Sequence, residues 1–439
     1  MMDMSKKKKI WIFNHYASDM YINRGGRHFY FAKYLIKKGY DVKIFCANTF
    51  HNKKDVVKVE NKKYAKKELD KISFIFVKTI PAIGNGIKRI LNMLIFYINI
   101  FNVAKDMKKE WTPDIILASS VHPLTLVAGI KIAKKYQIPC ICEVRDLWPE
   151  AIFNYGKVKE KSILGKLLIC GEHWIYKNAD AIIFTKPGDI DYLKEKKWLS
   201  SYGGDINEYK CHYINNGVDL ESYRKLEKNY ILNDEDLNND KFKVIYTGAI
   251  RPVNDLNFLI DTAEVLKQNY DIQFLIYGDG NQLNSLKETV SEKKLTNIKF
   301  KGFINKQNIP YILSKSSINV LNYSQTLYNW SRGNSSNKLF EYIAAGKPII
   351  STVKMGYNII EEYNIGLVLD NHSPKELAKK ILEIKNMKKE QYDIYLQNAR
   401  KCEKDFDYKE LTNKLLKVIE ELENENFSNG NRLSKRKST

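Results

Sequence analysis

The sequence lacks the cysteine spacings and the leader segment that mark metal-binding, redox and secreted proteins. Its cysteines are scattered, and the two nearest are separated by one residue, which fits no usual zinc or redox spacing. The N-terminal lysines are followed by few apolar residues before Asn14 and His15, too few for a signal peptide, so we expect a cytoplasmic protein. We expect reduced core thiols at all six positions: Cys46, Cys140, Cys142, Cys170, Cys211 and Cys402.

Motifs for metals, phosphate loops and nucleic acids are also missing. The acid-x-acid runs that begin at Asp189, Asp234 and Asp405 do not follow a predicted strand, as a metal-diphosphate site would require. The segment AAGKP at 344–348 lacks the earlier glycine and the final Ser or Thr of a phosphate loop. No zinc finger, RNA-recognition aromatic motif or basic zipper is present. We therefore expect no metal, no cofactor and no nucleic-acid partner.

Acidic residues are few relative to basic ones. The chain has 51 Asp and Glu against 72 Lys and Arg, a formal net charge of +21. Such a charge suits nucleic acid, an anionic membrane face or a phosphorylated substrate. Because the lysines are spread along the chain, a solvated basic surface explains it equally simply.

Long hydrophobic runs are scarce. The segment 90–104 has no charged residue, but its 15 residues are short of the ~20 that a membrane span needs. It is amphipathic, and either a core helix or a helix docked on an anionic membrane face fits its flanking lysines. One face carries Asn92, Asn99 and Asn102, and the residues we expect to be buried are Leu94, Ile95, Ile98 and Phe101.

What the sequence does contain is a regular alternation of β-branched or aromatic runs with helix-period segments. This pattern predicts parallel sheets with crossover helices, and 439 residues suit two such α/β domains. The first set of predicted strands is 10–14, 41–47, 72–78, 114–118, 139–144, 181–185 and 212–215. The second set is 243–247, 273–277, 298–302, 318–321, 349–352 and 367–369.

Composition also predicts the domain boundaries. We expect an N-terminal domain at 1–222, a polar linker at 223–240 and a C-terminal domain at 241–405. A helix at 406–426 has an apolar stripe that could pack back on the first domain, and the basic tail 427–439 is expected to be disordered. The stripe consists of Leu411, Leu415, Leu416, Ile419 and Leu422.

A helix start in the second domain has the features of a phosphate site. In RGNSSNKLFEYIAAGKPII, residues 332–350, Ser335, Ser336 or Asn337 can each cap a helix. The free N–H groups and the dipole of such a helix start form an anion site, and small residues let a diphosphate approach closely.

Lys338 and Glu341 share one face of that helix. They could form an ordinary ion pair at i and i+3. Alternatively, Lys338 lies near a phosphate and Glu341 accepts hydrogen bonds from a ribose diol.

Motifs in both halves resemble one known family. NKLFEYIAAGKPII, YTGAIRPVNDLNFLIDTAEVL, LIYGDGN, FKGFI and YINNGVD look like the C-terminal half of the retaining GT-B glycosyltransferases of the family-four type. GGRHFYFAKYLIKKGYDVKIFCA and ICEVRDLWPEAI look like their N-terminal half, and EVRDLWPE resembles the L-fucosamine and amino-sugar transferase branch of surface-polysaccharide assembly.

This resemblance implies a fold and a reaction. The fold is GT-B, with two Rossmann-like doubly wound domains facing a central cleft. The reaction transfers a sugar, with retention, from a nucleotide sugar, expected to be UDP-linked, to a lipid-diphosphate-linked saccharide acceptor. Because that acceptor lies at the membrane, the family implies a protein held peripherally at the anionic inner membrane surface.

Two departures from the family pattern concern the donor site. The family's helix carries two glutamates; Glu341 matches the second, which binds the ribose, whereas Gly333 replaces the first, which lies near the donor sugar. The arginine and lysine that clamp the leaving diphosphate align with Ala249 and Asn254. The nearest substitutes are Arg251 and Lys338, and Gly248 would line the same donor site.

The candidate acceptor-side residues lie in the first domain. Gly25 and Gly26 open a predicted helix and would permit close approach of a substrate, or form an ordinary turn. Arg145 and Asp146 follow a predicted strand, where Asp146 could orient or deprotonate an acceptor hydroxyl, or simply cap a helix and pair with Arg145. His122 is either a polar cleft residue or a loop histidine.

Two other functions remain open from the sequence. A nucleotide-sugar 2-epimerase has the same architecture, although its usual histidine and acid constellation is not evident, and it would turn over a nucleotide sugar without an acceptor. A nucleic-acid-binding protein would explain the charge and would show salt-sensitive binding to nucleic acid.

Overall fold

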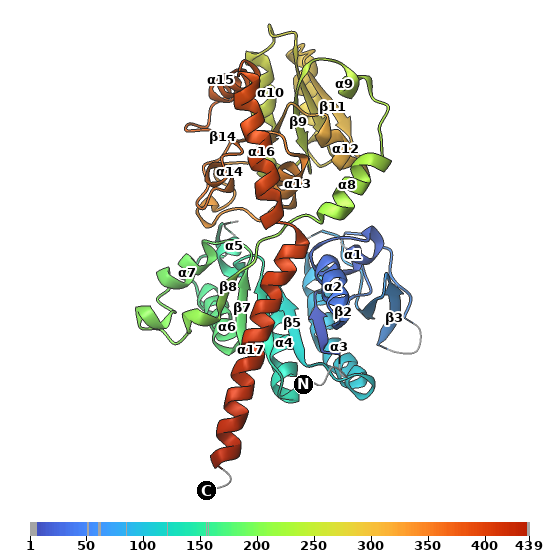
Figure 1. The fold of residues 1–439 in the computed structure, drawn as a ribbon, viewed down its shortest axis with the longest axis vertical. Coiled ribbons are helices and arrows are strands. Elements are labelled where there is room, and N and C mark those ends of the chain that lie inside the picture. Colours follow the sequence, from blue (N-terminus) through green and yellow to red (C-terminus); the bar gives the residue numbers. More distant parts are fainter. Residues whose placement is uncertain are drawn as a thin grey trace. The chain divides into compact units, whose positions relative to one another are not determined.

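The chain folds as two α/β units (Figure 1), and the computed structural model describes residues 7–50, 52–59, 63–84, 86–120, 122–154, 156 and 158–436, with side chains to residue 424. The first unit is Met1–Asn215 with Tyr408–Thr439, and the second is Asn216–Asp407. The expected linker 223–240 belongs to the second unit, where it contains most of α8 (Leu220–Asn229) and all of α9 (Glu235–Asn238).

The first unit is built on an eight-stranded sheet in the order β3-β4-β2-β1-β5-β6-β7-β8. All neighbours are parallel except β3 and β4, and the strands between the sheet edges are almost fully buried, which is why they appear in the sequence as continuous apolar runs. The strands are β1 (Lys9–Phe13), β2 (Asp41–Ala47), β3 (Tyr64–Leu69), β4 (Ile72–Val77), β5 (Ile115–Ser119), β6 (Cys140–Val144), β7 (Ala181–Phe184) and β8 (Cys211–Tyr213).

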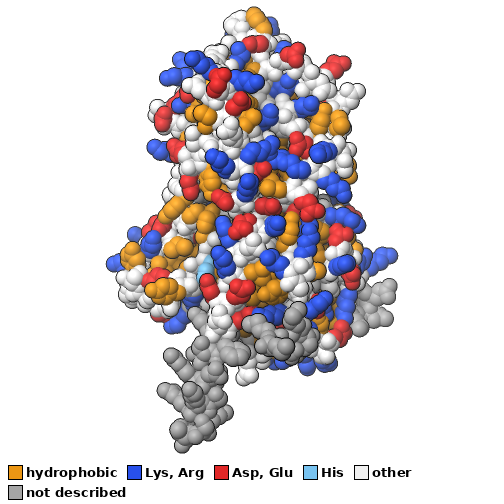
Figure 2. Space-filling view, in the orientation of Figure 1, with side chains coloured by type: hydrophobic (Ala, Val, Ile, Leu, Met, Phe, Trp, Pro, Cys, Tyr) orange, Lys and Arg blue, Asp and Glu red, His pale blue; other side chains and the backbone are white. Residues whose placement is uncertain are grey.

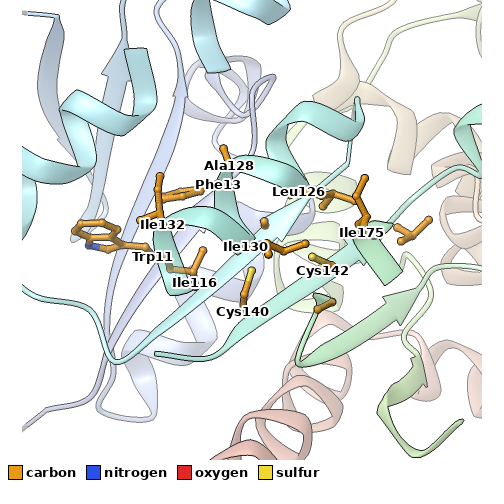
Figure 3. Close-up of a cluster of buried hydrophobic side chains, with 14 of the residues drawn as sticks. Trp11, Phe13, Ile116, Leu126, Ala128, Ile130, Ile132, Cys140, Cys142 and Ile175 are labelled. Carbon is orange, nitrogen blue, oxygen red and sulfur yellow. The ribbon is translucent and has the colours of Figure 1, made fainter. Parts of the chain in front are cut away.

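Helices cover both faces of this sheet. One core cluster joins the sheet to α2 and α17, and the other joins it to α3, α4 and α6. Figure 3 shows the second cluster, where Trp11 and Cys140 from the sheet meet Ile130 and Ile132 from α4. The helices are α1 (Ser18–Asn23), α2 (Arg27–Lys37), α3 (Ile87–Glu110), α4 (Pro123–Tyr136), α5 (Trp148–Asn154), α6 (Ile163–Asn178), α7 (Asp189–Glu195), α17 (Tyr408–Arg436), and the short 3-10 turns η1 (Ser200–Tyr202) and η2 (Glu208–Lys210).

The second unit has a six-stranded parallel sheet in the order β11-β10-β9-β12-β13-β14. Helices α10, α11 and α15 contribute to one core cluster, and α8, α12, α13, α14 and α16 to the other. The strands are β9 (Phe242–Thr247), β10 (Ile272–Tyr277), β11 (Ile298–Gly302), β12 (Ile318–Leu321), β13 (Ile349–Ser351) and β14 (Gly366–Val368). The remaining elements are α10 (Leu256–Val265), α11 (Leu283–Glu292), α12 (Ile309–Ser314), α13 (Asn337–Ala345), α14 (Ile359–Glu362), α15 (Pro374–Lys385), α16 (Lys389–Asp405), η3 (Pro252–Asn254), η4 (Lys306–Asn308) and η5 (Trp330–Arg332).

The predicted fold of two doubly wound domains is confirmed, and every predicted strand is present. β3 was not predicted. Its exposed Lys66, Lys67 and Glu68 break the apolar pattern, as is common for a strand at a sheet edge.

The apolar stripe of the last helix is buried in the core cluster of the first unit, where α17 packs beside α2. α17 continues to Arg436, so the predicted disordered tail 427–439 begins inside this helix, and 437–439 lie outside the described residues. All six cysteines are free thiols, but Cys170 is exposed rather than in the core as expected.

α3 contains the uncharged segment and buries the face opposite to the one we expected. Asn92 is buried and donates to the Thr49 and Thr79 hydroxyls, whereas Leu94 and Ile98 are exposed. By length and composition α3 could cross a membrane, and only 33% of its most apolar window is buried. It is therefore a core helix on one side with an apolar outer side.

On the face drawn in Figure 2, Lys and Arg side chains are spread widely and interspersed with Asp and Glu. On this face the arrangement favours the solvated basic surface over a single basic patch.

Candidate functional site

The strand order locates one crevice in each unit. Doubly wound sheets bind ligands outside the carboxyl ends of their strands, where the strand order reverses. In the second unit this point lies between β9 and β12, and in the first unit between β1 and β5. The candidate residues are therefore described relative to these two points.

Lys338, on the first turn of α13, reaches the carboxyl end of β9. Its Nζ donates to the Tyr246 hydroxyl at 3.0 Å and lies 3.4 Å from Oδ1 of Asn254. The ammonium also lies 4.2 Å from the ring centroid of Tyr246 and 4.7 Å from that of Tyr323, which is cation–π distance. Burial lowers the pKa of Lys338 to about 7.

Gly248 makes this approach possible. Its φ is +145°, and a Cβ there would lie 2.9 Å from Cε of Lys338. Tyr342, also on α13, accepts a hydrogen bond from the Thr247 N–H at 2.9 Å, so the helix is fixed against the end of β9.

The first turn of α13 has no side-chain cap at its N-cap residue. Ser336 is that residue, and its hydroxyl accepts from the Tyr323 hydroxyl at 2.7 Å instead of capping the helix. The Ser336 N–H donates to Asn334, and Ser335 and Asn337 flank the N-cap position. A first turn that the Ser336 side chain leaves uncapped suits an anion site.

Glu341 does not pair with Lys338 in the described structure, so the ordinary i, i+3 ion pair is wrong here. Its nearest cation is Lys306, whose Nζ lies 3.8 Å from Oε1. Burial raises the pKa of Glu341, and its side chain is still 22% exposed. A partly exposed carboxylate one turn beyond Lys338 can accept from a ligand.

Arg251 lies in the same loop as Gly248 but outside the Lys338 cluster. It is exposed, immediately before η3, and its guanidinium makes no hydrogen bond or ion pair with any described residue, although its carbonyl accepts from the Asn254 N–H. Asn254 in this loop donates to the Ala249 carbonyl at 2.8 Å and faces Lys338. Of the two sequence-predicted substitutes for the missing cations, only Lys338 is held in place.

In the first unit, Arg145 and Asp146 follow β6 as predicted. Asp146 is 59% exposed, and its carboxylate lies 3.8 Å from Nζ of Lys186, which follows β7. Lys186 itself is buried and lies 3.6 Å from the buried Asp189. Asp146 is not paired with Arg145 among the described residues, so the alternative of a paired helix cap is wrong.

Beneath these residues lies a buried network around Glu143. Its carboxylate accepts from Nε of Arg27 at 2.7 Å and from the Ser119 hydroxyl at 2.8 Å, and Nε2 of His28 is 3.1 Å away. Although burial opposes it, Arg27 and His28 hold the pKa of Glu143 below its ordinary value. The network joins β6 to the start of α2.

Gly25 and Gly26 precede α2 in a turn. Gly26 is the N-cap residue with φ +111°, and a Cβ there would lie 3.1 Å from Met20. A Cβ on Gly25 would meet the Tyr30 hydroxyl at 2.9 Å. Local packing therefore already explains why glycines stand at both positions, which fits the alternative of an ordinary turn.

His122 is a buried residue at the β1/β5 point. Its Nε2 lies 2.7 Å from Nδ1 of His15, and burial lowers the pKa of His122 to about 3. It is neutral at physiological pH and is neither an exposed loop histidine nor a ready proton acceptor.

The acid-x-acid runs have structural partners. Asp234 and Asp236 are paired with Lys299 and Lys301, and Asp405 accepts from Tyr363. Across the residues that the structure describes, no three His, Cys, Asp or Glu side chains are grouped for a metal. The absence of a metal requirement stays a prediction.

Models of two protein families match the two halves of the chain. Residues 28–222 match "Glycosyltransferase Family 4", and residues 227–402 match "Glycosyl transferases group 1". The chain belongs to the GT-B glycosyltransferases. The amino-sugar branch and retention are proposals taken up below.

Similar proteins include enzymes of sugar transfer. The glycosyltransferase is 26% identical over 231 residues to TuaH of Bacillus subtilis (strain 168), which has a provisional assignment as a teichuronic acid biosynthesis glycosyltransferase; the match covers 49% of this chain and 55% of TuaH, so it spans about half of that relative. Among solved structures, sucrose-phosphate synthase from Thermosynechococcus elongatus matches with TM-score 0.66 at 16% identity, over 95% of this chain and 99% of that one. HepE from Anabaena, solved with UDP, matches with TM-score 0.60 at 12% identity, over 94% and 100%.

Sequence reasoning missed several residues of this glycosyltransferase's candidate sites. Tyr246 was predicted only as part of an apolar strand, Tyr323 lies just beyond the predicted strand 318–321, and Glu143 lies within an apolar strand. Lys186 was detectable, since it follows a predicted strand at its carboxyl end, as Asp146 does.

Proposed function

We propose that this glycosyltransferase transfers a sugar, with retention, from a UDP-linked nucleotide sugar to a lipid-diphosphate-linked saccharide in surface-polysaccharide assembly. The nucleotide-sugar part of this proposal rests on one observation. The ammonium of Lys338 is held at the end of β9 and at the start of α13. The UDP complex of HepE and the teichuronic acid assignment of TuaH support a UDP donor and a polysaccharide product.

In this proposal the donor lies at the start of α13. The N–H groups near Ser335, Ser336 and Asn337 receive the diphosphate, and Lys338 neutralises its charge. Gly248 leaves room for it, and Glu341 accepts from the ribose diol. With Gly333 in place of an acid, recognition of the donor sugar falls to other residues, in keeping with the amino-sugar branch.

The chemistry we propose depends on charge stabilisation. As the glycosidic bond breaks, negative charge grows on the departing UDP, and a preorganised cation there can lower the barrier by several kcal/mol. Lys338 is that cation, and Arg251 adds a second from the exposed loop. With no protein nucleophile assigned, the acceptor hydroxyl attacks from the face that the diphosphate leaves, which retains the configuration.

On the acceptor side, Asp146 is the residue we assign to orient or deprotonate the hydroxyl, because it is exposed at the end of β6 beside Lys186. Arg145 adds positive charge for the acceptor diphosphate. Because His122 is buried and neutral, we limit its role to holding the side chain of His15 in position.

We further propose a cytoplasmic protein held peripherally on the anionic inner membrane surface. The exposed Ile90, Leu94 and Ile98 of α3 form an apolar outer side, and Lys88 and Lys105 flank it. Apolar side chains with neighbouring lysines suit the interface of an anionic membrane.

Replacing Glu341 with Ala is expected to weaken UDP binding about tenfold to hundredfold, because a charge-assisted hydrogen bond contributes about 1.5–3 kcal/mol. Calorimetry with UDP measures the change. The matched control is Glu361→Ala on α14, an acid in the same unit with no assigned role. Unchanged UDP affinity in Glu341→Ala would remove the ribose assignment.

Replacing Arg251 with Ala is expected to lower kcat about tenfold while the donor Kd changes less than about threefold, because the loop cation acts on charge that appears only as UDP departs. Lys379→Ala, another exposed cation in the second unit, serves as the control. A loss of donor affinity with unchanged kcat would show that Arg251 binds the donor in the ground state instead.

A further inference from the structure

The first unit contains an apolar cavity that the donor chemistry does not use. It has a volume of about 190 Å³ and lies among α4, α5 and α6. Ser120 and Asp146 also line it, so it reaches the carboxyl ends of β5 and β6. Its walls include Leu124, Val127, Trp148, Ile152, Leu168 and Ile175.

The one buried acid on the cavity wall is already satisfied. Both carboxyl oxygens of Glu172 accept hydrogen bonds, one from the Tyr176 hydroxyl and one from the Tyr192 hydroxyl, each at 2.7 Å. Burial raises the pKa of Glu172 to about 7, so about half of these groups are uncharged near neutral pH. The wall therefore suits an apolar occupant better than a sugar, whose hydroxyls would need free hydrogen-bond partners.

The cavity continues onto an exposed apolar strip at the start of α6. Leu167 lines the cavity and is 64% exposed, and Ile163 and Leu164 on the preceding turn are 83% and 54% exposed. Exposed lysines lie beside the strip at 161 and 166. An apolar chain could therefore pass from an anionic lipid surface along α6 into the cavity.

The opposite end of the cavity is charged. Asp146 lines it, the buried Lys186 lies 3.8 Å from that carboxylate, and Arg145 precedes it in the chain. Apolar walls that end at a carboxylate with a buried ammonium beside it match an amphiphile with a charged head. A diphosphate would lie near Lys186 and Arg145, and the chain it carries would fill the cavity.

We propose that this cavity binds the first part of the hydrocarbon chain of the acceptor lipid, so that its diphosphate is placed beside Asp146. The proposal rests on the proposed function, because the lipid-linked acceptor comes from there. It goes further in naming the residues that select a lipid-linked acceptor over a free saccharide phosphate.

The test uses farnesyl diphosphate as the lipid probe and inorganic pyrophosphate as its chainless counterpart, with binding to the full-length protein measured by calorimetry. We expect farnesyl diphosphate to bind at least tenfold more tightly, about 1.4 kcal/mol, because its chain enters the cavity. Equal binding of the two probes would overturn the proposal.

Gly171→Phe fills the cavity without a backbone clash, since Gly171 lines it and no atom lies within 4 Å of an added Cβ. We expect this variant to lose the farnesyl preference at least tenfold and to keep its pyrophosphate affinity. Cys170→Phe adds the same ring at the neighbouring exposed position. We expect this control to change neither the farnesyl preference nor the pyrophosphate affinity. Gly171→Leu, a smaller filler, should give an intermediate loss.

UDP binding separates this proposal from the function on which it depends. A wild-type protein that binds UDP but does not prefer farnesyl diphosphate would overturn the cavity assignment alone. A protein that binds no UDP would overturn the proposed function. A farnesyl preference that survives in Gly171→Phe, with its thermal unfolding unchanged, would place the chain elsewhere.

Discussion

Lys338→Met is expected to lower kcat by about 10²–10³ while the protein stays folded, the loss typical of removing one preorganised charge-stabilising group. Methionine keeps an unbranched stem near Tyr246 and Tyr323 and removes the ammonium, with its charge and its hydrogen bonds. The control is Lys347→Met, just beyond the other end of α13. Wild-type turnover in Lys338→Met would contradict the leaving-group role.

Lys338→Met should also change the proton uptake that accompanies UDP binding. Because burial lowers the pKa of Lys338 to about 7, the ammonium is mostly deprotonated at pH 8 in the free protein and mostly protonated at pH 6. A bound diphosphate favours the charged form. UDP binding should therefore take up a proton at pH 8 and close to none at pH 6, which calorimetry in two buffers of different ionisation enthalpy measures. Lys338→Met should abolish the uptake.

The sheets were predictable because their strands are short and apolar on both faces. Ile12, Ile44 and Ile276 are buried, and their strands lie between turn signals in the sequence. β3 escaped detection because three consecutive residues, Lys66, Lys67 and Glu68, are exposed and break the apolar pattern. The amphipathic direction of α3 was predicted the wrong way round. Asn92 is buried there because Thr49 and Thr79, distant in sequence, supply partners for its amide.

The candidate sites were predictable only as positions along strands and helices. The sequence placed Asp146 after a strand and Lys338 at the start of a helix, but spacing could not show that Lys338 turns toward β9 and not toward Glu341. That direction depends on Tyr246 and Asn254, which tertiary folding brings close. Long-range hydrogen bonds of this kind leave no periodic pattern in the sequence.

Glu143→Gln is expected to destabilise the first unit by about 3–5 kcal/mol, because removing one partner of a buried ion pair leaves the other charge uncompensated. Arg27 and Glu143 are almost completely inaccessible, with side-chain exposures of 2% and 0%. For a unit of this size the melting temperature should fall by about 10 °C, which differential scanning calorimetry measures. Asp205→Asn, which removes an exposed partner of His173 and Lys177, should leave the melting temperature nearly unchanged.

The lowered pKa of Glu143 also predicts how the stability difference between wild type and Glu143→Gln changes with pH. Since the folded protein holds the pKa of Glu143 below its ordinary value, the carboxylate contributes stability above pH ~4.5, and that contribution falls as the pH drops toward the lowered pKa. The stability gap between wild type and Glu143→Gln should thus be widest near neutral pH and narrow in acid. Arg27 also donates to the carbonyls of Ile214 and Asn215, so the charge pair joins β6 and α2 to the end of the first unit. A gap that is small at pH 7, or that widens in acid, would mean that Arg27 is held by these carbonyls and not by Glu143.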